Sequence, residues 1–149
     1  MAAEVDVRTE TVIRRPPHEV AGYAGDPGNA PDWYSNIRSV EWLTSPPVAV
    51  GSRLAFVASF LGRRLAYTYE VVEFEPGRRL VMRTADGPFP METTYTWEPA
   101  AEGASRMTLR NRGRPSGFAR VTAPAMAVAM RRANTADLAR LKDLLEAST

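Results

Sequence analysis

Large apolar side chains alternate with Thr, Glu or Arg along several stretches of this 149-residue chain. The clearest stretch covers residues 91–98, in which Met91, Tyr95 and Trp97 share one phase and polar residues fill the other. A period of two is typical of a β-strand with one face buried and the other face in water. Because the pattern returns at residues 54–60 and 107–111, we expect a sheet with one apolar face.

The alternating stretches are separated by short segments that contain Gly, Pro or Asp, as hairpin connections require. We therefore predict about seven strands in an antiparallel meander. The predicted strands are residues 5–13, 38–44, 51–61, 63–74, 78–85, 89–98 and 106–112.

Helical segments are expected at two places. Two short helices, 18–24 and 30–37, should lie between the first two strands, and Pro17 suits the first turn of the former. From residue 116 onward the apolar period changes to three and four, which indicates one long amphipathic helix. Pro124 should start or kink this helix. The residues of its apolar stripe are Met126, Met130, Asp137, Leu141 and Leu144.

Composition limits the kinds of protein that the chain can be. Its length favours one domain, residues 1–149. Without cysteine it can form no disulfide, zinc–thiolate site or cysteine nucleophile, which fits a cytoplasmic protein. The first 15 residues lack the apolar core of a signal peptide, and the longest apolar run, 121–130, is too short to span a bilayer. We expect no stable membrane insertion.

Titratable residues give little support to metal or acid–base chemistry. His18 is the only histidine, so neither a histidine-rich zinc site nor a Ser–His–Asp hydrolase is expected. No carboxylate is predicted to point clearly inward, which argues against a glycosidase-like pair. The glycine-containing runs match neither a P-loop nor a dinucleotide fingerprint, and we expect no metal and no cofactor.

Two surfaces could bind a partner. The last strand carries arginines on its outward phase, but interleaved Thr and Glu and a net charge of only +2 favour a solvated face over a nucleic-acid site. These arginines are Arg106, Arg110, Arg112 and Arg114. The run 121–130, beside Arg131 and Arg132, is the best candidate for an apolar interface, either of a homodimer or with another partner.

The inner phase of the predicted sheet is rich in Tyr, Trp and Met. Any one of these residues could simply pack the core, but several buried tyrosines are costly in a dry interior and suit a partly wet pocket. Methionine adds an adaptable lining. The candidate ligand-binding residues are Trp33, Phe56, Phe60, Met82, Met91, Trp97, Met107, Met126, Met130 and Asn134. Trp33 is expected either to cap the pocket mouth or to pack beneath a loop.

Over almost its whole length the chain resembles the START-like (SRPBCC, Bet v 1-like) superfamily, within its group of bacterial polyketide cyclase/dehydrase and lipid-transport proteins. The stretches that carry the resemblance are residues 11–20, 26–33, 71–80 and 137–146. The resemblance implies an α+β helix-grip fold, in which a curved antiparallel sheet wraps around a long C-terminal helix. It also implies a cavity between the sheet and that helix.

The leading hypothesis is therefore that the chain binds a small, largely apolar, ring-containing molecule. If it is an enzyme, it most resembles a polyketide cyclase/dehydratase, for which phenols and an amide would polarise carbonyl groups of a held chain. The candidate catalytic residues are Tyr67, Tyr69, Tyr95 and Asn111. Two alternatives remain, a non-catalytic carrier or sensor of a lipid, quinone or metabolite, and a partner-binding module with a vestigial pocket.

Overall fold

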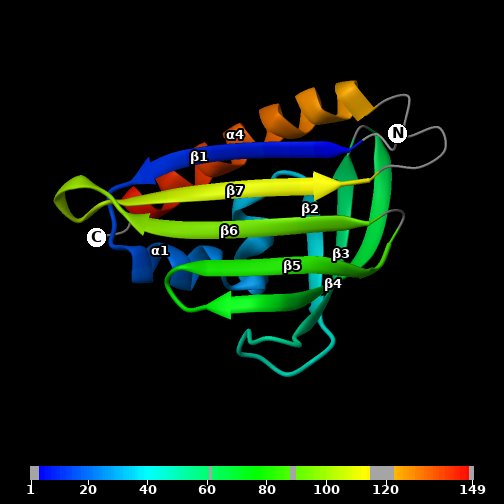
Figure 1. The fold of residues 1–149 in the computed structure, drawn as a ribbon, viewed down its shortest axis with the longest axis horizontal. Helices are drawn as coiled ribbons and strands as arrows, with labels where there is room; N and C mark the ends of the chain where they lie inside the picture. Colours follow the sequence, from blue (N-terminus) through cyan, green and yellow to red (C-terminus); the bar gives the residue numbers. More distant parts are fainter. Residues whose placement is uncertain (1–3, 61, 88–89, 115–122, 148–149) are drawn as a thin grey trace.

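The computed structural model describes residues 4–60, 62–87, 90–114 and 123–147, and it contains one seven-stranded antiparallel sheet. Its strand order is β1-β7-β6-β5-β4-β3-β2, so the last strand, β7, lies between β6 and the first strand, β1 (Figure 1). The strands are β1 (Val5–Ile13), β2 (Ile37–Trp42), β3 (Arg53–Phe60), β4 (Arg63–Glu75), β5 (Arg79–Asp86), β6 (Met91–Pro99) and β7 (Ser105–Gly113).

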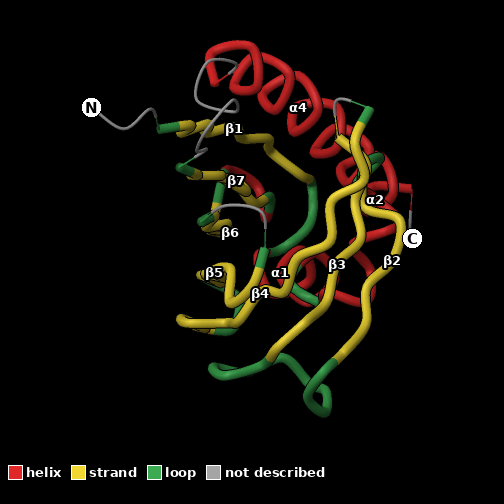
Figure 2. The backbone as a smooth tube through the Cα atoms, turned by 90° about the vertical axis from the view of Figure 1, so that its right-hand side faces the viewer, coloured by secondary structure: helices red, strands yellow, loops and turns green. Residues whose placement is uncertain are grey.

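The sheet is strongly curved, and a long helix, α4 (Ala123–Ala147), lies along its concave side. Figure 2 shows β6 and β7 on one side of the interior, β2 and β3 on the other, and α4 between β1 and α2 (Ala30–Trp33). Two shifts of register between β4 and β5 contribute to the bend, because an extra residue in one strand of a pair increases the local twist. This architecture confirms the predicted helix-grip fold.

Of the two short helices before β2, the first ends at the predicted residue and the second ends earlier than the sequence predicts. The first, α1 (Pro17–Ala24), has a proline in its first turn, as expected. The second was predicted to reach residue 37, but it ends at Trp33, and the backbone is already extended at Tyr34 (φ −84°, ψ 125°). The β2–β3 ladder begins where Ile37 pairs with Ala58, so residue 37, which was predicted to end the helix, lies in a strand instead.

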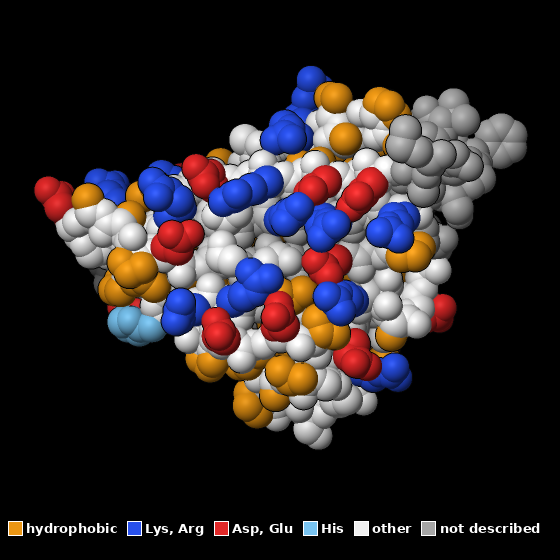
Figure 3. Space-filling model, in the orientation of Figure 1, with side chains coloured by type: hydrophobic (Ala, Val, Ile, Leu, Met, Phe, Trp, Pro, Cys, Tyr) orange, Lys and Arg blue, Asp and Glu red, His pale blue; other side chains and the backbone are white. Residues whose placement is uncertain are grey.

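Charged residues on the convex face are paired across the strands. In Figure 3 basic and acidic side chains are interspersed over this face. The ion pairs that join neighbouring strands are Arg110–Asp6, Arg112–Glu4, Arg83–Glu92, Arg79–Glu73 and Arg53–Glu70. Each exposed pair contributes no more than about 1 kcal/mol to stability. Their main effect is to neutralise the arginine-rich phase of the sheet, as expected for a solvated face.

The concave face and the inner side of α4 form the core. A main cluster of buried side chains joins the inner sheet residues to Trp33, Leu138 and Leu141. A smaller cluster joins the first turns of α4 to β1 through Met126 and Val7. None of the described helices is long and apolar enough to cross a membrane.

The C-terminal end of α4 is fixed to the end of β1 by charged groups. Glu146 accepts hydrogen bonds from the Arg14 backbone N–H (2.9 Å) and from the Lys142 ammonium (2.6 Å), and it pairs with the Arg14 guanidinium (3.2 Å). Lys142 also donates to the carbonyl oxygen of Val12 (2.7 Å). These donors lower the pKa of the Glu146 carboxyl to about 2. The contacts hold α4 across the concave face.

Candidate ligand-binding site

A chain of hydroxyl and amide groups crosses the inner face of the sheet. Thr93 Oγ1 donates to Asn111 Oδ1 (2.8 Å), and Thr93 Oγ1 lies 2.8 Å from the Tyr69 hydroxyl. Since the single hydroxyl hydrogen of Thr93 goes to Asn111, Tyr69 must be the donor to Thr93. The register explains the contact, because Thr93 and Asn111 are direct partners in the β6–β7 ladder.

A second polar contact joins the loop after α2 to the sheet. The hydroxyl groups of Tyr34 and Tyr95 lie 2.6 Å apart, although the two residues are 61 positions apart in the sequence. The ring of Trp33 contacts both tyrosine rings, and its centroid lies 4.1 Å from that of Tyr34 and 5.9 Å from that of Tyr95. Tyr95 is in turn in edge contact with Trp97 (5.9 Å).

A third group of rings lines β3 and β4. Phe56 stacks on Tyr67 with centroids 5.4 Å apart, and Tyr69 contacts both rings edge-on, at 5.7 Å and 5.0 Å. Phe56 and Tyr69 are buried, whereas Tyr67 is only partly buried. The alternation of β3 and β4 brings these three predicted residues together on one face.

Burial keeps the phenols protonated. It raises the pKa of Tyr69 to about 12 and raises the pKa values of Tyr34, Tyr67 and Tyr95 well above that of a free tyrosine. Near neutral pH all four are therefore neutral groups that can donate a hydrogen bond. Such groups can stabilise negative charge on a ligand oxygen, but as neutral phenols they are poor bases and nucleophiles.

The prediction that no carboxylate points inward is wrong. Asp137, on α4, is only 2% exposed, and its Oδ1 accepts a hydrogen bond from the Ser35 backbone N–H (3.0 Å). Burial raises the pKa of the Asp137 carboxyl, and the Ser35 hydrogen bonds oppose part of that shift. Its position on the apolar stripe, seven residues after Met130 and four before Leu141, already indicated the inner face of the helix.

Most of the other predicted ligand-binding residues lie in the main cluster. Trp33 is 1% exposed and belongs to this core, so it does not lie at an exposed rim. Met91 is partly buried against the cluster. The side chain of Phe60 lies outside the described residues. Besides Trp33, the predicted residues that are buried in this cluster are Phe56, Met82, Trp97 and Met107.

Three predicted residues on α4 divide into two groups. Met126 and Met130 pack with Val5 and Val7 of β1, in the smaller cluster and apart from the phenols. Asn134 is 4% exposed, and its Nδ2 has no hydrogen-bond partner among the described residues. Of these three residues, only Asn134 adds a buried polar group to the interior. The two methionines belong to the apolar contact between α4 and β1.

Sequence reasoning did not select Tyr34, Thr93 or Asp137 as site residues. Thr93 could have been found from its phase, because it alternates with Tyr95 and Trp97. Tyr34 gave no comparable signal, since its partner Tyr95 is distant in sequence and the contact depends on the loop after α2.

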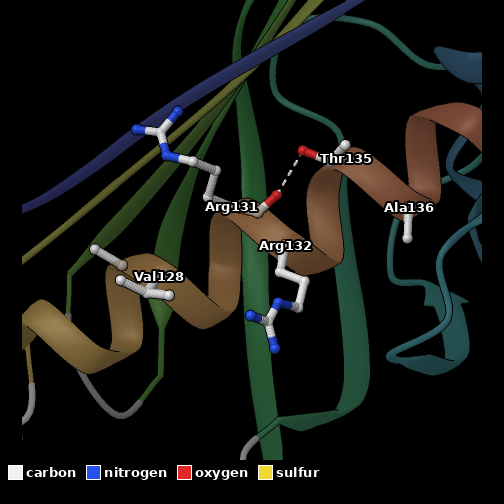
Figure 4. Close-up of a pocket in the computed structure, with 6 residues that line it drawn as sticks. Val128, Arg131, Arg132, Thr135 and Ala136 are labelled. Atoms are coloured by element: carbon white, nitrogen blue, oxygen red, sulfur yellow. Dashed lines mark hydrogen bonds between the residues drawn. The ribbon is translucent and has the colours of Figure 1, made fainter.

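An open hollow of about 660 Å³ lies on the solvent side of α4 (Figure 4). Its lining residues Val128, Arg131, Arg132, Thr135 and Ala136 are exposed or half-buried, and Ala127 is half-buried. Figure 4 shows Arg131 and Arg132 leaving the helix on different sides. Helical periodicity places this stripe away from Asn134 and Asp137, so the hollow is separate from the phenols.

Acidic and histidine side chains do not gather into a metal site within residues 4–60, 62–87, 90–114 and 123–147. In these ranges no three His, Asp or Glu side chains are placed so that they could hold a metal ion, and the chain has no cysteine. His18 is exposed near the start of α1.

The chain belongs to the family described as polyketide cyclase/dehydrase and lipid transport, whose profile matches residues 4–146. This membership confirms the resemblance found in the sequence. Family and fold are consistent with binding of a hydrophobic ligand or with cyclase/dehydrase activity. No curated protein sequence matches the chain significantly.

Solved structures share the fold at low sequence identity. The protein TTHA0849 from Thermus thermophilus superimposes with a TM-score of 0.83 at 21% identity, over 97% of this chain and 99% of that one. The Zhui aromatase/cyclase from a Streptomyces species gives 0.79 at 16% identity, over 96% and 94%. The major latex-like protein 151 of Panax ginseng gives 0.71 at 13% identity, over 97% and 96%.

Proposed function

We propose that this protein binds a small, largely apolar, ring-containing molecule between α4 and the concave face of the sheet. The observation that carries the proposal is the linked set Tyr69–Thr93–Asn111 beside a core built mainly of aromatic and aliphatic side chains. Hydroxyl and amide groups are expensive to bury without polar partners, and a packed core is normally built without them. On the face of a ligand site they fix the orientation of a ligand whose remaining surface is apolar.

The same groups support the finer proposal of a polyketide cyclase/dehydrase. In an aldol cyclisation an enol carbon attacks a ketone carbon, and negative charge develops on the ketone oxygen until that oxygen is protonated. Neutral phenols such as Tyr67 and Tyr95 can donate hydrogen bonds to this oxygen. The aromatic walls would hold the flexible chain in a conformation close to that of the product.

A carrier or sensor without chemistry is the second candidate. The hydrogen bonds between hydroxyl groups favour this candidate, because Tyr34 pairs with Tyr95 and Tyr69 pairs with Thr93. An apolar ligand that makes no hydrogen bond would leave these hydroxyl groups paired. Incubation with a poly-β-ketone thioester distinguishes the two candidates. A cyclase yields a dehydrated ring product, whereas a carrier returns the thioester unchanged beyond its spontaneous reaction.

The binding proposal is tested by filling the interior. Ala58 is 6% exposed on the phase of β3 that also carries Phe56. Ala58→Phe should therefore weaken binding of the fluorescent probe N-phenyl-1-naphthylamine about tenfold or more, because a clash of this size costs roughly 1–3 kcal/mol. Fluorescence titration measures the affinity, and thermal melting checks that the variant is folded.

Val57→Phe is the matched control, because Val57 is the neighbouring residue on the opposite phase of β3 and is only partly buried. It should leave the affinity for the probe unchanged. Equal affinities of the wild type and a folded Ala58→Phe variant would contradict binding beneath α4. If Ala58→Phe does not fold, Ala58→Leu applies the same test with a smaller side chain.

A further inference from the structure

Two polar atoms on the inner side of α4 have no hydrogen-bond partner among the described residues. They are Nδ2 of Asn134, a donor, and Oδ2 of Asp137, an acceptor when the carboxyl is ionised. Their side chains belong to residues that are 4% and 2% exposed. Buried polar groups are nearly always paired, and an unpaired one is costly enough to need an explanation. A bound partner supplied from outside the chain is one such explanation.

The two side chains are neighbours on the inner side of α4. Asn134 and Asp137 are three positions apart on a helix, a spacing that places Cβ atoms about 5–6 Å apart on the same side. Asp137 is anchored by the Ser35 backbone N–H on Oδ1, which leaves Oδ2 for another partner. The charge of Asp137 also acts on the phenols of Tyr34 and Tyr95, so the pair adjoins the proposed ligand site.

Donor and acceptor together select one kind of functional group. A hydroxyl group can accept a hydrogen bond from Asn134 Nδ2 and donate its own hydrogen to Asp137 Oδ2. A ketone oxygen has no hydrogen to donate, and an apolar group satisfies neither atom. A hydroxyl oxygen can also accept a hydrogen bond from the carboxyl in its protonated form, so it fits both states of Asp137.

We propose that Asn134 and Asp137 form a binding site for a hydroxyl group, alcoholic or phenolic, carried by the apolar ligand. The inference rests on the proposed function, because it names the polar end of the molecule bound beneath α4. It adds the orientation of that ligand, whose hydroxyl group faces α4 while its ring faces the aromatic walls of the sheet. A trapped water molecule could satisfy the same two atoms, and the experiment must separate these occupants.

The test compares two probes of almost equal size, 2-naphthol and 2-methylnaphthalene, which differ only in a hydroxyl in place of a methyl group. The wild type should bind 2-naphthol more tightly by about tenfold to a hundredfold, the range that a hydrogen bond to a charged group supplies. Asn134→Leu, of similar volume, should reduce this preference to near unity while 2-methylnaphthalene still binds. Affinities come from calorimetry or from quenching of tryptophan fluorescence.

Thr135→Ala is the matched control, since Thr135 is exposed on the same helix and its hydroxyl donates to the Arg131 carbonyl oxygen. It should keep the full preference for 2-naphthol. Asn134→Leu removes an unpaired buried amide, so its melting temperature without ligand should equal or exceed that of the wild type. If that variant does not fold, Asp137→Asn, which retains an oxygen for the Ser35 N–H, should weaken 2-naphthol selectively.

Three other outcomes would contradict hydroxyl binding by Asn134 and Asp137. Equal wild-type affinities for the two probes would show that water or nothing occupies the site, and would overturn this inference while leaving the proposed function intact. A preference that survives in folded Asn134→Leu would place hydroxyl recognition elsewhere. Failure of both probes to bind the wild type would overturn the proposed function and this inference together.

Discussion

Asp137 is the residue at which the interior departs most from an ordinary apolar core. One carboxylate oxygen accepts a hydrogen bond from the Ser35 backbone N–H, and the other has no hydrogen-bond partner among the described residues. Asp137 therefore links the loop after α2 to the long helix that closes the sheet. The carboxylate stabilises this junction through Oδ1, but its burial destabilises the charged form.

Replacing Asp137 by Asn should stabilise the protein at neutral pH. Burial raises the pKa of Asp137 above 3.8, although Arg140 acts in the opposite direction, so the folded state holds this proton more tightly than the unfolded chain. Stability from the protonated form is thus present at low pH and is lost as pH rises through the raised pKa. Asn keeps an oxygen for the Ser35 N–H and carries no charge.

We expect Asp137→Asn to increase the free energy of unfolding on the order of 1 kcal/mol at pH 7, and by much less near pH 4. Urea denaturation at the two pH values measures the difference. A variant that is less stable than the wild type, with a larger loss at pH 7 than near pH 4, would show instead that the charged carboxylate of Asp137 stabilises the folded state.

At the scale of elements, α4 is positioned by contacts at both ends. Met126 packs against Val7 of β1 near the start of the helix, and Glu146 joins the other end to Arg14. These contacts hold the helix across the concave face. The stretch between these ends carries Asn134 and Asp137.

Glu146→Gln should weaken this attachment in a pH-dependent way. The pKa of Glu146 is lowered from 4.5 to about 2, so the stabilisation that the carboxylate provides is present above pH 4.5 and is lost as pH falls towards 2. Thermal melting should show a lower melting temperature for the variant at pH 7, and no difference near pH 2. The exposed Asp143→Asn, on the same helix, is the control. A difference that persists at pH 2 would mean that the charge of Glu146 is not what holds the helix.

The fold could be predicted because alternation and turn residues are local signals. Residues 5–13 were predicted as β1 with the observed bounds, and the phase of β6 correctly placed Tyr95 inside. The contacts of the candidate site were harder to predict, because they depend on the register of strand pairing and on segments that are far apart in the sequence. The pair Tyr34–Tyr95 and the Ser35–Asp137 bond both require the early end of α2, which is decided by strand pairing and not by the local sequence.

At the scale of the whole molecule, one sheet separates two kinds of chemistry on its two faces. The convex face carries ion pairs such as Arg110–Asp6, and the concave face carries the neutral hydroxyl groups of Tyr69 and Tyr95. The period of two assigns residues to each face, and the bend of the sheet encloses only one of them. The family and the fold fit this division, since the enclosed face is the one suited to an apolar ligand.

The most direct test of ligand binding is native mass spectrometry of the protein purified from its own host, compared with its denatured mass. We expect an additional mass that is lost on denaturation and belongs to an apolar ring compound that carries a hydroxyl group. A bound ligand at a hundredfold its Kd should also stabilise the fold by about 2.7 kcal/mol. A bare native mass, together with no stabilisation by any compound in a hydrophobic ligand screen, would contradict ligand binding and favour a partner-binding module with a vestigial pocket.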